Sequence, residues 1–194
     1  MINLKTEHSD INEDFKRIAT ELMNEWVLKI QNATYRITEL EFYIRSSDHP
    51  DNYTHGHELQ KKSGSWYFHG SGIDITFGSD NSYGGILIRA LQRMEKPGNF
   101  TYGPINVVTE LFSNLQDVYN SSLSFGLIEA RNLPFEKPLA APRVGLTKEK
   151  NPEMYDKYYR FLILPREKHG EKEKIAEAMK LQGYSETEIK SIWK

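Results

Sequence analysis

The sequence predicts an α+β protein, because patterns typical of helices and of strands follow one another along its 194 residues. Hydrophobic residues make up 38% of the chain and aromatic residues 12%, which is enough for a core and excludes global disorder. The length is typical of one domain, or of one domain with a small appendage. We expect the main domain to span residues 1–165 and a tail of two short helices to span residues 166–194.

The first part of the main domain is expected to contain a helix, a strand and a long loop. In residues 11–30, apolar side chains recur at helical spacing. Turn-forming residues predict a loop over 45–64. Residues 34–44 alternate as a strand does, with one face made up of Thr38, Leu40, Phe42 and Ile44 and the other of Ile37, Glu39, Glu41 and Tyr43.

The rest of the chain is expected to contain further strands and helices. In the tail, Gly183 is expected to end the first helix, and Ser185 with Glu188 forms a capping-box pattern that begins the second. Before the tail we expect, in order, a hairpin over 65–79 that turns at Gly70-Ser71-Gly72, an apolar strand over 84–91, a helix over 104–118, a proline-rich loop over 134–145 and a strand over 158–164.

Composition excludes several classes of protein. The chain has no cysteine, which rules out disulfide scaffolds, thiolate metal sites and cysteine nucleophiles. Lys and Arg number 25 against 27 Asp and Glu, a balance that counts against strong nonspecific binding to nucleic acid. No apolar run approaches the roughly 20 residues of a membrane span, and the first residues do not resemble a signal peptide. We expect a cytoplasmic, monomeric protein that does not associate with membranes.

Glu41 and Arg89 form the most informative pair of candidate residues. Arg89 lies within the apolar stretch ILIRAL, and a buried guanidinium needs a carboxylate partner. Glu41, on the polar face of residues 34–44, is the natural partner. Two interpretations stay open: a general base oriented by an arginine, or a structural ion pair between neighbouring strands.

Three histidines form a second candidate group. His55 and His57, with Asp51 or Glu58 nearby, offer metal ligands, but their spacing matches no established metal motif. We therefore expect no metal. Together with His69, these histidines can instead line a pocket that binds a nucleobase.

Aromatic residues of the expected hairpin provide stacking surfaces. Trp66, Tyr67 and Phe68 follow one another, and a planar ligand can stack on such rings. The alternative is that some of these side chains belong to the core.

Short motifs recur in a familiar order over about residues 15–165. They are RITELEFY at 36–43, the histidines of the following loop, the aromatic hairpin WYFHGSGIDITFG at 66–78, LIRAL at 87–91, Gly103-Pro104, PRVGL at 142–146 and Tyr159-Arg160-Phe161. In this order the chain resembles the alkyladenine (3-methyladenine) DNA glycosylase family. The resemblance implies one mixed α/β domain around a curved antiparallel sheet, similar also to a formyltransferase C-terminal domain.

The resemblance also implies a function and roles for individual residues. It implies a DNA glycosylase that binds a flipped, damaged or modified base and cleaves the N-glycosidic bond with water, without a cofactor. Glu41 matches the glutamate that activates this water, and Arg89 the arginine that helps to hold it. For stacking on the base, the resemblance implies Tyr43 and either Tyr67 or Phe68. On the opposite side of the base it implies His55 or, as a less close match, His57. Asp74 takes the place of an asparagine in the family's pocket.

Two departures from the family pattern leave other functions open. The hairpin tip from His69 to Gly72 is short and lacks a bulky residue that wedges into duplex DNA. Asp74 replaces an asparagine, and a carboxylate there favours a cationic or amino-bearing ring. The alternatives are a non-catalytic module that binds a nucleobase, a nucleotide or a protein partner, and an enzyme that cleaves free nucleosides.

Overall fold

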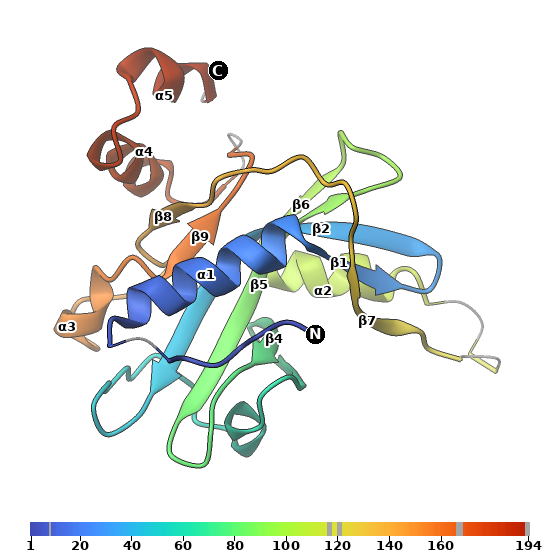
Figure 1. The fold of residues 1–194 in the computed structure, drawn as a ribbon, viewed down its shortest axis with the longest axis horizontal. Coiled ribbons are helices and arrows are strands. Elements are labelled where there is room, and N and C mark those ends of the chain that lie inside the picture. Colours follow the sequence, from blue (N-terminus) through green and yellow to red (C-terminus); the bar gives the residue numbers. More distant parts are fainter. Residues whose placement is uncertain (8, 116–117, 120–121, 166–168, 193–194) are drawn as a thin grey trace.

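The computed structural model describes the chain except for residues 8, 116–117, 120–121, 166–168 and 193–194 (Figure 1). Its elements follow in this order: α1 (Ile11–Asn24), β1 (Trp26–Ile30), β2 (Ala33–Arg45), the 3-10 helix η1 (Glu58–Lys61), β3 (Trp66–His69), β4 (Gly72–Thr76), β5 (Tyr83–Arg93), β6 (Phe100–Tyr102), α2 (Pro104–Phe112), β7 (Phe125–Glu129), β8 (Leu139–Ala141), α3 (Pro152–Tyr155), β9 (Arg160–Leu162), α4 (Lys172–Leu181) and α5 (Glu186–Ile192).

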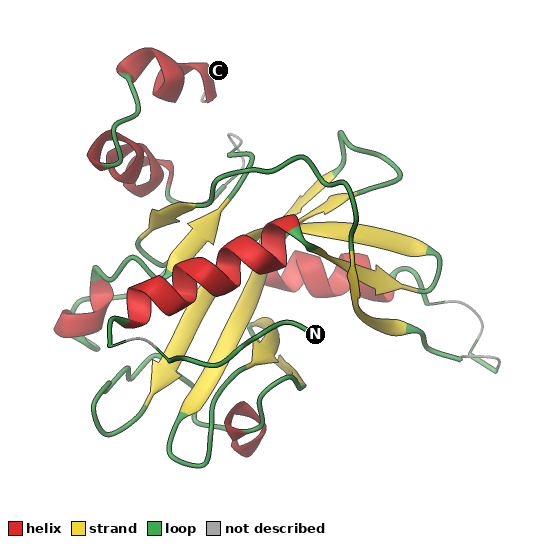
Figure 2. Cartoon of the chain, in the orientation of Figure 1, coloured by secondary structure: helices red, strands yellow, loops and turns green. Residues whose placement is uncertain are grey.

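The described strands form one curved antiparallel sheet. The main order is β3-β4-β5-β2-β1-β7, while β6 pairs with β5, and β8 joins β2 through β9. The two long strands β2 and β5 run through the middle of the sheet, and α1 lies across them (Figures 1 and 2). The expected α+β class, with a curved antiparallel sheet and helices at the C-terminal end, is therefore confirmed.

The first helix is shorter than its periodicity predicts. Its N-cap Asp10 accepts a hydrogen bond from the backbone of Asn12, and Phe15 is fully buried on its inner face. The helix ends at Asn24, so the predicted helix over 11–30 is wrong after that point. Trp26–Ile30 forms β1 instead, because its aromatic and branched side chains fit between two antiparallel neighbours, β2 and β7.

The alternation of β2 is interrupted near Thr38. The register with β5 shifts between Ile37 and Glu39 and again between Glu39 and Leu40. Ile37 was expected beside the two glutamates, and it lies instead in the main apolar core with Leu40. A β-bulge changes which side a residue faces, and the sequence pattern of one strand does not reveal it. From Glu39 to Ile44 the predicted alternation holds, with Leu40, Phe42 and Ile44 in the core.

The hairpin and the middle helix lie where the sequence predicts them. The strands β3 and β4 pair from Trp66 opposite Ile75 to His69 opposite Gly72, with the turn between His69 and Gly72. The helix α2 begins at Pro104, behind the Gly103 N-cap, but ends at Phe112 rather than at residue 118. Residues 116–117 of that prediction lie outside the described residues.

Several short elements were not expected. The strand β7 had no prediction, and β8 lies inside the predicted proline-rich loop. The 3-10 helix η1 interrupts the loop predicted over 45–64. Two of these elements are edge segments of three to five residues, too short for an apolar period to identify.

The tail packs on the sheet through its own apolar cluster. The capping box predicted at Ser185 and Glu188 is present, since each side chain accepts a hydrogen bond from the other residue's backbone N–H. The cluster joins both tail helices to β8 and β9 and contains Leu139, Ala141, Leu162, Ile175, Ala178, Met179 and Ile189. None of the helices within the described part of the chain is long and apolar enough to cross a bilayer.

Aromatic rings fill the core between α1 and the sheet. Phe15 stacks on Phe42 with ring centroids 4.4 Å apart, and Phe77, Tyr159 and Phe161 meet this pair edge-on. These contacts fix β2 against α1 and hold the carboxylates on the opposite side of β2 in place.

We predict that Phe42→Ala lowers the free energy of unfolding by about 3–5 kcal/mol, because it leaves a cavity among these rings. As a control, Phe68→Ala removes a ring that is 45% exposed and is expected to cost less than about 1 kcal/mol. Urea denaturation measures both. Equal losses for the two variants would contradict this description of the core.

Candidate functional site

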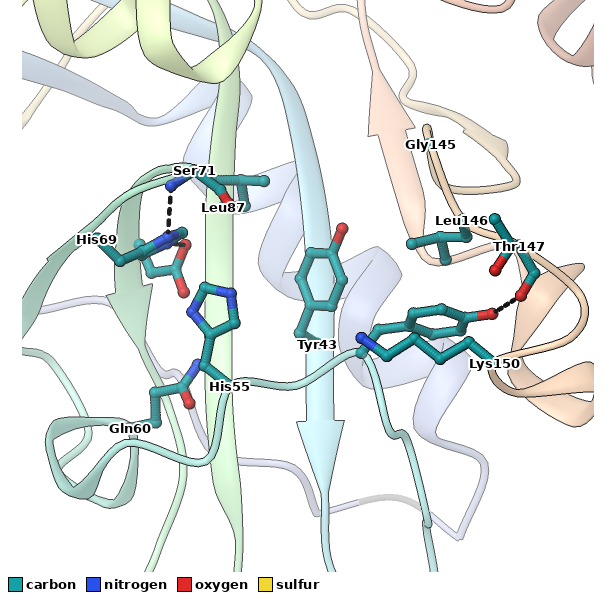
Figure 3. Close-up of a pocket in the computed structure, with 12 residues that line it drawn as sticks. Tyr43, His55, Gln60, His69, Ser71, Leu87, Gly145, Leu146, Thr147 and Lys150 are labelled. Atoms are coloured by element: carbon teal, nitrogen blue, oxygen red, sulfur yellow. Dashed lines mark hydrogen bonds and ion pairs between the residues drawn. The ribbon is translucent and has the colours of Figure 1, made fainter.

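A pocket of about 370 Å³ opens beside the C-terminal part of β2. Its walls come from β2, the loop after it, η1, the β3–β4 hairpin, β5 and the segment 145–150 (Figure 3). Tyr43 lies in the middle of the pocket, with His55 on one side and Lys150 on the other. The complete lining is Tyr43, Tyr53, His55, Gln60, His69, Ser71, Asp74, Leu87, Gly145, Leu146, Thr147 and Lys150.

The predicted partnership of Glu41 and Arg89 is present. Arg89 Nη1 donates to Glu41 Oε2 over 3.2 Å, and the hydroxyl of Tyr43 donates to the same oxygen over 2.7 Å. The other oxygen, Glu41 Oε1, accepts a hydrogen bond of 2.6 Å from the backbone N–H of Val144. Glu41 is fully buried, so these contacts fix its carboxylate in one orientation.

The Glu41 carboxylate lies behind the wall of the pocket. Neither Glu41 nor Arg89 is among the lining residues, whereas Tyr43 lines the pocket and bonds to Glu41. Burial, and next the charge of Glu41, raise the pKa of Tyr43 well above its usual value, although the nearby Arg143 opposes this. Tyr43 therefore remains a neutral hydroxyl that connects the pocket with the buried carboxylate.

Arg89 is shared with a second buried carboxylate. Its Nε donates to Glu39 Oε1 over 3.0 Å, and Arg160 Nε reaches the same oxygen over 2.8 Å. His169 Nδ1 lies 2.7 Å from Glu39 Oε2. Burial alone raises the pKa of Glu39, but the bond to His169 and the charges of Arg160 and Arg89 outweigh it and lower this pKa to about 2.

Two members of this network were not predicted as site residues. Arg160 carries the same signal as Arg89, an arginine within an apolar strand, and that signal could have identified it. No such signal marks His169, because it reaches Glu39 only through the path of the chain between β9 and α4.

A buried arginine also positions the segment that contacts Glu41. Arg143 is fully buried, donates to Asp51 Oδ2 over 2.7 Å, and bonds to the backbone oxygen of Phe42 over 3.1 Å. Its guanidinium lies 4.5 Å from the ring centre of Tyr43. Arg143 thus holds the next residue, Val144, where its N–H reaches Glu41.

The predicted histidines lie close together at one end of the pocket. His69 Nε2 is 3.0 Å from Asp74 Oδ1, and the rings of His55 and His69 meet at right angles with centroids 4.5 Å apart. Desolvation by burial, followed by the charge of His69, lowers the pKa of His55. His57 does not line the pocket but stacks on the ring of Tyr67, with centroids 4.7 Å apart.

The two hairpin aromatics expected to stack a base lie elsewhere. Tyr67 is nearly buried, and its hydroxyl is 3.4 Å from His55 Nδ1, but it is not a lining residue. Phe68 contacts Phe112 and Phe125 instead, since alternate residues of a strand face opposite sides. The tyrosines that line the pocket are Tyr43 and Tyr53.

No group of three or more potential metal ligands is present in the described ranges of the chain. The residues present offer acid–base groups, aromatic faces and hydrogen-bonding edges.

Fold and site together define an α+β protein with a polar and aromatic pocket above a buried carboxylate–arginine pair. No family model matches the chain. It is 31% identical over 195 residues to the uncharacterized protein L759 of Acanthamoeba polyphaga mimivirus, a match that covers 81% of this chain and 89% of the viral protein. The chain belongs to the same family as this viral protein.

We predict that Glu39 makes stability depend on acid pH. Its pKa in the folded protein, about 2, is below the ordinary value of 4.5, so its ionised form stabilises the fold above pH 4.5. This contribution, on the order of 3 kcal/mol, is lost as the pH falls from about 4.5 towards 2. The free energy of unfolding, measured at several pH values, should decrease over this interval.

The variant Glu39→Gln should be less stable at neutral pH and should lack this part of the acid dependence. The exposed Glu129→Gln serves as the matched control and should follow the wild type. An unchanged acid dependence in Glu39→Gln would contradict the assignment.

Proposed function

We propose that this protein is an N-glycosylase-like hydrolase of the alkyladenine DNA glycosylase type. In this proposal it binds a flipped, damaged or modified purine base in DNA and cleaves the N-glycosidic bond with an activated water. The observation that carries the proposal is the link from the pocket through Tyr43 to Glu41, whose carboxylate Arg89 holds in one orientation. The order of sequence motifs supports the same class of enzyme.

The reaction needs a pocket that holds the nucleobase and a general base that takes a proton from water. The flipped nucleobase would stack against Tyr43, with His55 on the other side. The oxygen of a water bound beside Tyr43 forms a bond with the anomeric carbon, and the bond from that carbon to the nucleobase breaks. The leaving base keeps the bonding electrons, and the proton from water passes by way of the Tyr43 hydroxyl to Glu41.

The short hairpin tip suggests which DNA is accepted. The His69 ring accepts a hydrogen bond of 3.2 Å from the backbone of Ser71 and bonds to Asp74, so this side chain belongs to the pocket wall. A hairpin with no bulky wedge favours bases that are already unstacked, in single strands or at damaged pairs. The cytoplasmic location and the monomeric state expected from the sequence belong to the same proposal.

A second candidate is a non-catalytic module that binds a nucleobase, a nucleotide or a protein partner. Its support is the complete burial of Glu41, both of whose oxygens already accept hydrogen bonds from the protein. A carboxylate satisfied in this way also fits a purely structural role.

We predict that the protein releases damaged bases from DNA and that Glu41→Gln abolishes the release. Single-turnover assays with excess protein would use single- and double-stranded oligonucleotides that carry 3-methyladenine, hypoxanthine or ethenoadenine. The variant should lose at least about 100-fold in rate, because a general base typically contributes 10²–10⁴-fold.

The exposed Glu129→Gln is the control for this assay and should retain full activity. No release by the wild type, combined with binding of free bases, would favour the binding module. Equal release by wild type and Glu41→Gln would overturn the role of Glu41.

A further inference from the structure

Two polar atoms lie side by side at the pocket, over a glycine of β5. A side-chain carbon added at Gly85 would lie 2.4 Å from Asp74 Oδ2 and 2.8 Å from Gln60 Nε2. A larger residue at this position would displace the two side-chain ends, so the glycine leaves room for the two polar groups. Asp74 and Gln60 both line the pocket.

The amide of Gln60 has a fixed orientation. Its Oε1 accepts hydrogen bonds from the backbone N–H groups of Gly56, over 2.8 Å, and His57, over 3.1 Å. An amide oxygen held by two donors leaves the NH₂ group on the other side, next to Asp74. Gln60 therefore presents a hydrogen-bond donor to the pocket.

Asp74 is fixed in the same way. His69 Nδ1 accepts from the backbone of Ser71, so Nε2 carries the proton that His69 shares with Asp74 Oδ1 over 3.0 Å. The remaining oxygen, Oδ2, is the one beside Gln60. Asp74 therefore presents a charged hydrogen-bond acceptor.

Neither of these two atoms is satisfied by the protein. Asp74 is 3% exposed and Gln60 is 1% exposed, yet within the described part of the chain neither Asp74 Oδ2 nor Gln60 Nε2 has a hydrogen-bond partner. Neither atom is among the completely buried atoms that lack a partner, so both are open to the pocket, and a ligand that bonds to both gains from each bond.

We propose that Asp74 and Gln60 select a nucleobase by one edge, which must carry an N–H donor directly beside an acceptor. Asp74 Oδ2 accepts the N–H, and Gln60 Nε2 donates to the neighbouring ring nitrogen or carbonyl oxygen. Adenine has such an edge, because its exocyclic amino group is a donor beside a ring nitrogen that accepts. Hypoxanthine has one too, because the N–H of its lactam is a donor beside the carbonyl oxygen. Bases that offer acceptors alone are rejected, because the Asp74 carboxylate then faces a lone pair.

This inference rests on the proposed function, since it assumes that the pocket binds a nucleobase. Calorimetric titration with bases that carry a methyl group on N9 tests it without any need for catalysis, because this methyl group removes the ring N–H beside N3 that every free purine has. Among these N9-methylated bases, the decisive ligands are the N6-methyladenine, which keeps one N–H, and the N6,N6-dimethyladenine, which has none. The N9-methylated purine without a substituent at C6 lacks the amino group and is smaller than adenine, so it separates a lost hydrogen bond from a steric clash.

We expect adenine, N6-methyladenine and hypoxanthine to bind, and dimethyladenine and purine to bind at least about tenfold more weakly than adenine. The relative affinities of adenine and hypoxanthine show whether the amino or the lactam edge is preferred. Equal affinity for adenine, dimethyladenine and purine would overturn this inference and leave the nucleobase pocket in place. Binding of no base at all would overturn both proposals.

Two isosteric variants test the two residues separately. Gln60→Glu keeps the oxygen that accepts from Gly56 and His57 and replaces only the donor, so adenine should bind at least about tenfold more weakly. Asp74→Asn replaces the acceptor by an amide, so the preference for N6-methyladenine over dimethyladenine should disappear. The exposed Asp80→Asn is the control and should bind as the wild type does. Unchanged selectivity in Asp74→Asn would refute the role of Asp74.

Discussion

The contact between Arg89 and two glutamates of one strand is the interaction on which the site depends. Arg89 bonds to Glu39 and Glu41, which lie two residues apart on β2. Buried charges are tolerated only when they are paired and hydrogen-bonded, and here the partners of the two glutamates come from three different parts of the chain. Arg160 brings β9 to the network, and His169 brings the connection to the tail. The network thus ties the middle of the sheet to β9 and the tail, and the bond from Val144 to Glu41 ties it to the segment that lines the pocket.

The pocket takes its polar character from residues that are themselves held in place. Tyr43 is fixed by Glu41, and Asp74 is fixed by His69. Such a preorganised arrangement suits recognition of a flat ligand with a defined edge, because little order has to be created on binding. Under the proposed function, this arrangement would also separate two tasks within one site: selection by hydrogen bonds at the hairpin end and acid–base chemistry behind Tyr43.

The sequence predicted those parts of the site that depend on the pattern of a single strand or on the chemistry of a single side chain. The row of Glu39, Glu41 and Tyr43 followed from the period of a strand, and the pairing of Arg89 followed from the cost of a buried guanidinium. The bulge at Thr38 and the short strands β7 and β8 were missed because they form only against neighbouring strands. The contact of His169 with Glu39 joins residues 130 positions apart, so no local pattern marks it.

The central claim is that Glu41 and Arg89 act as one unit in the reaction and not only as a structural ion pair. A double-mutant cycle with Glu41→Gln, Arg89→Met and the double variant tests it, with base release and urea denaturation measured on all four proteins. If the claim is right, Arg89→Met loses activity beyond its loss of folded protein, and the double variant is no slower than Glu41→Gln alone. Two results would contradict it. One is a double variant whose loss of activity is the product of the two single losses, and the other is an Arg89→Met variant whose activity falls only in proportion to its folded fraction.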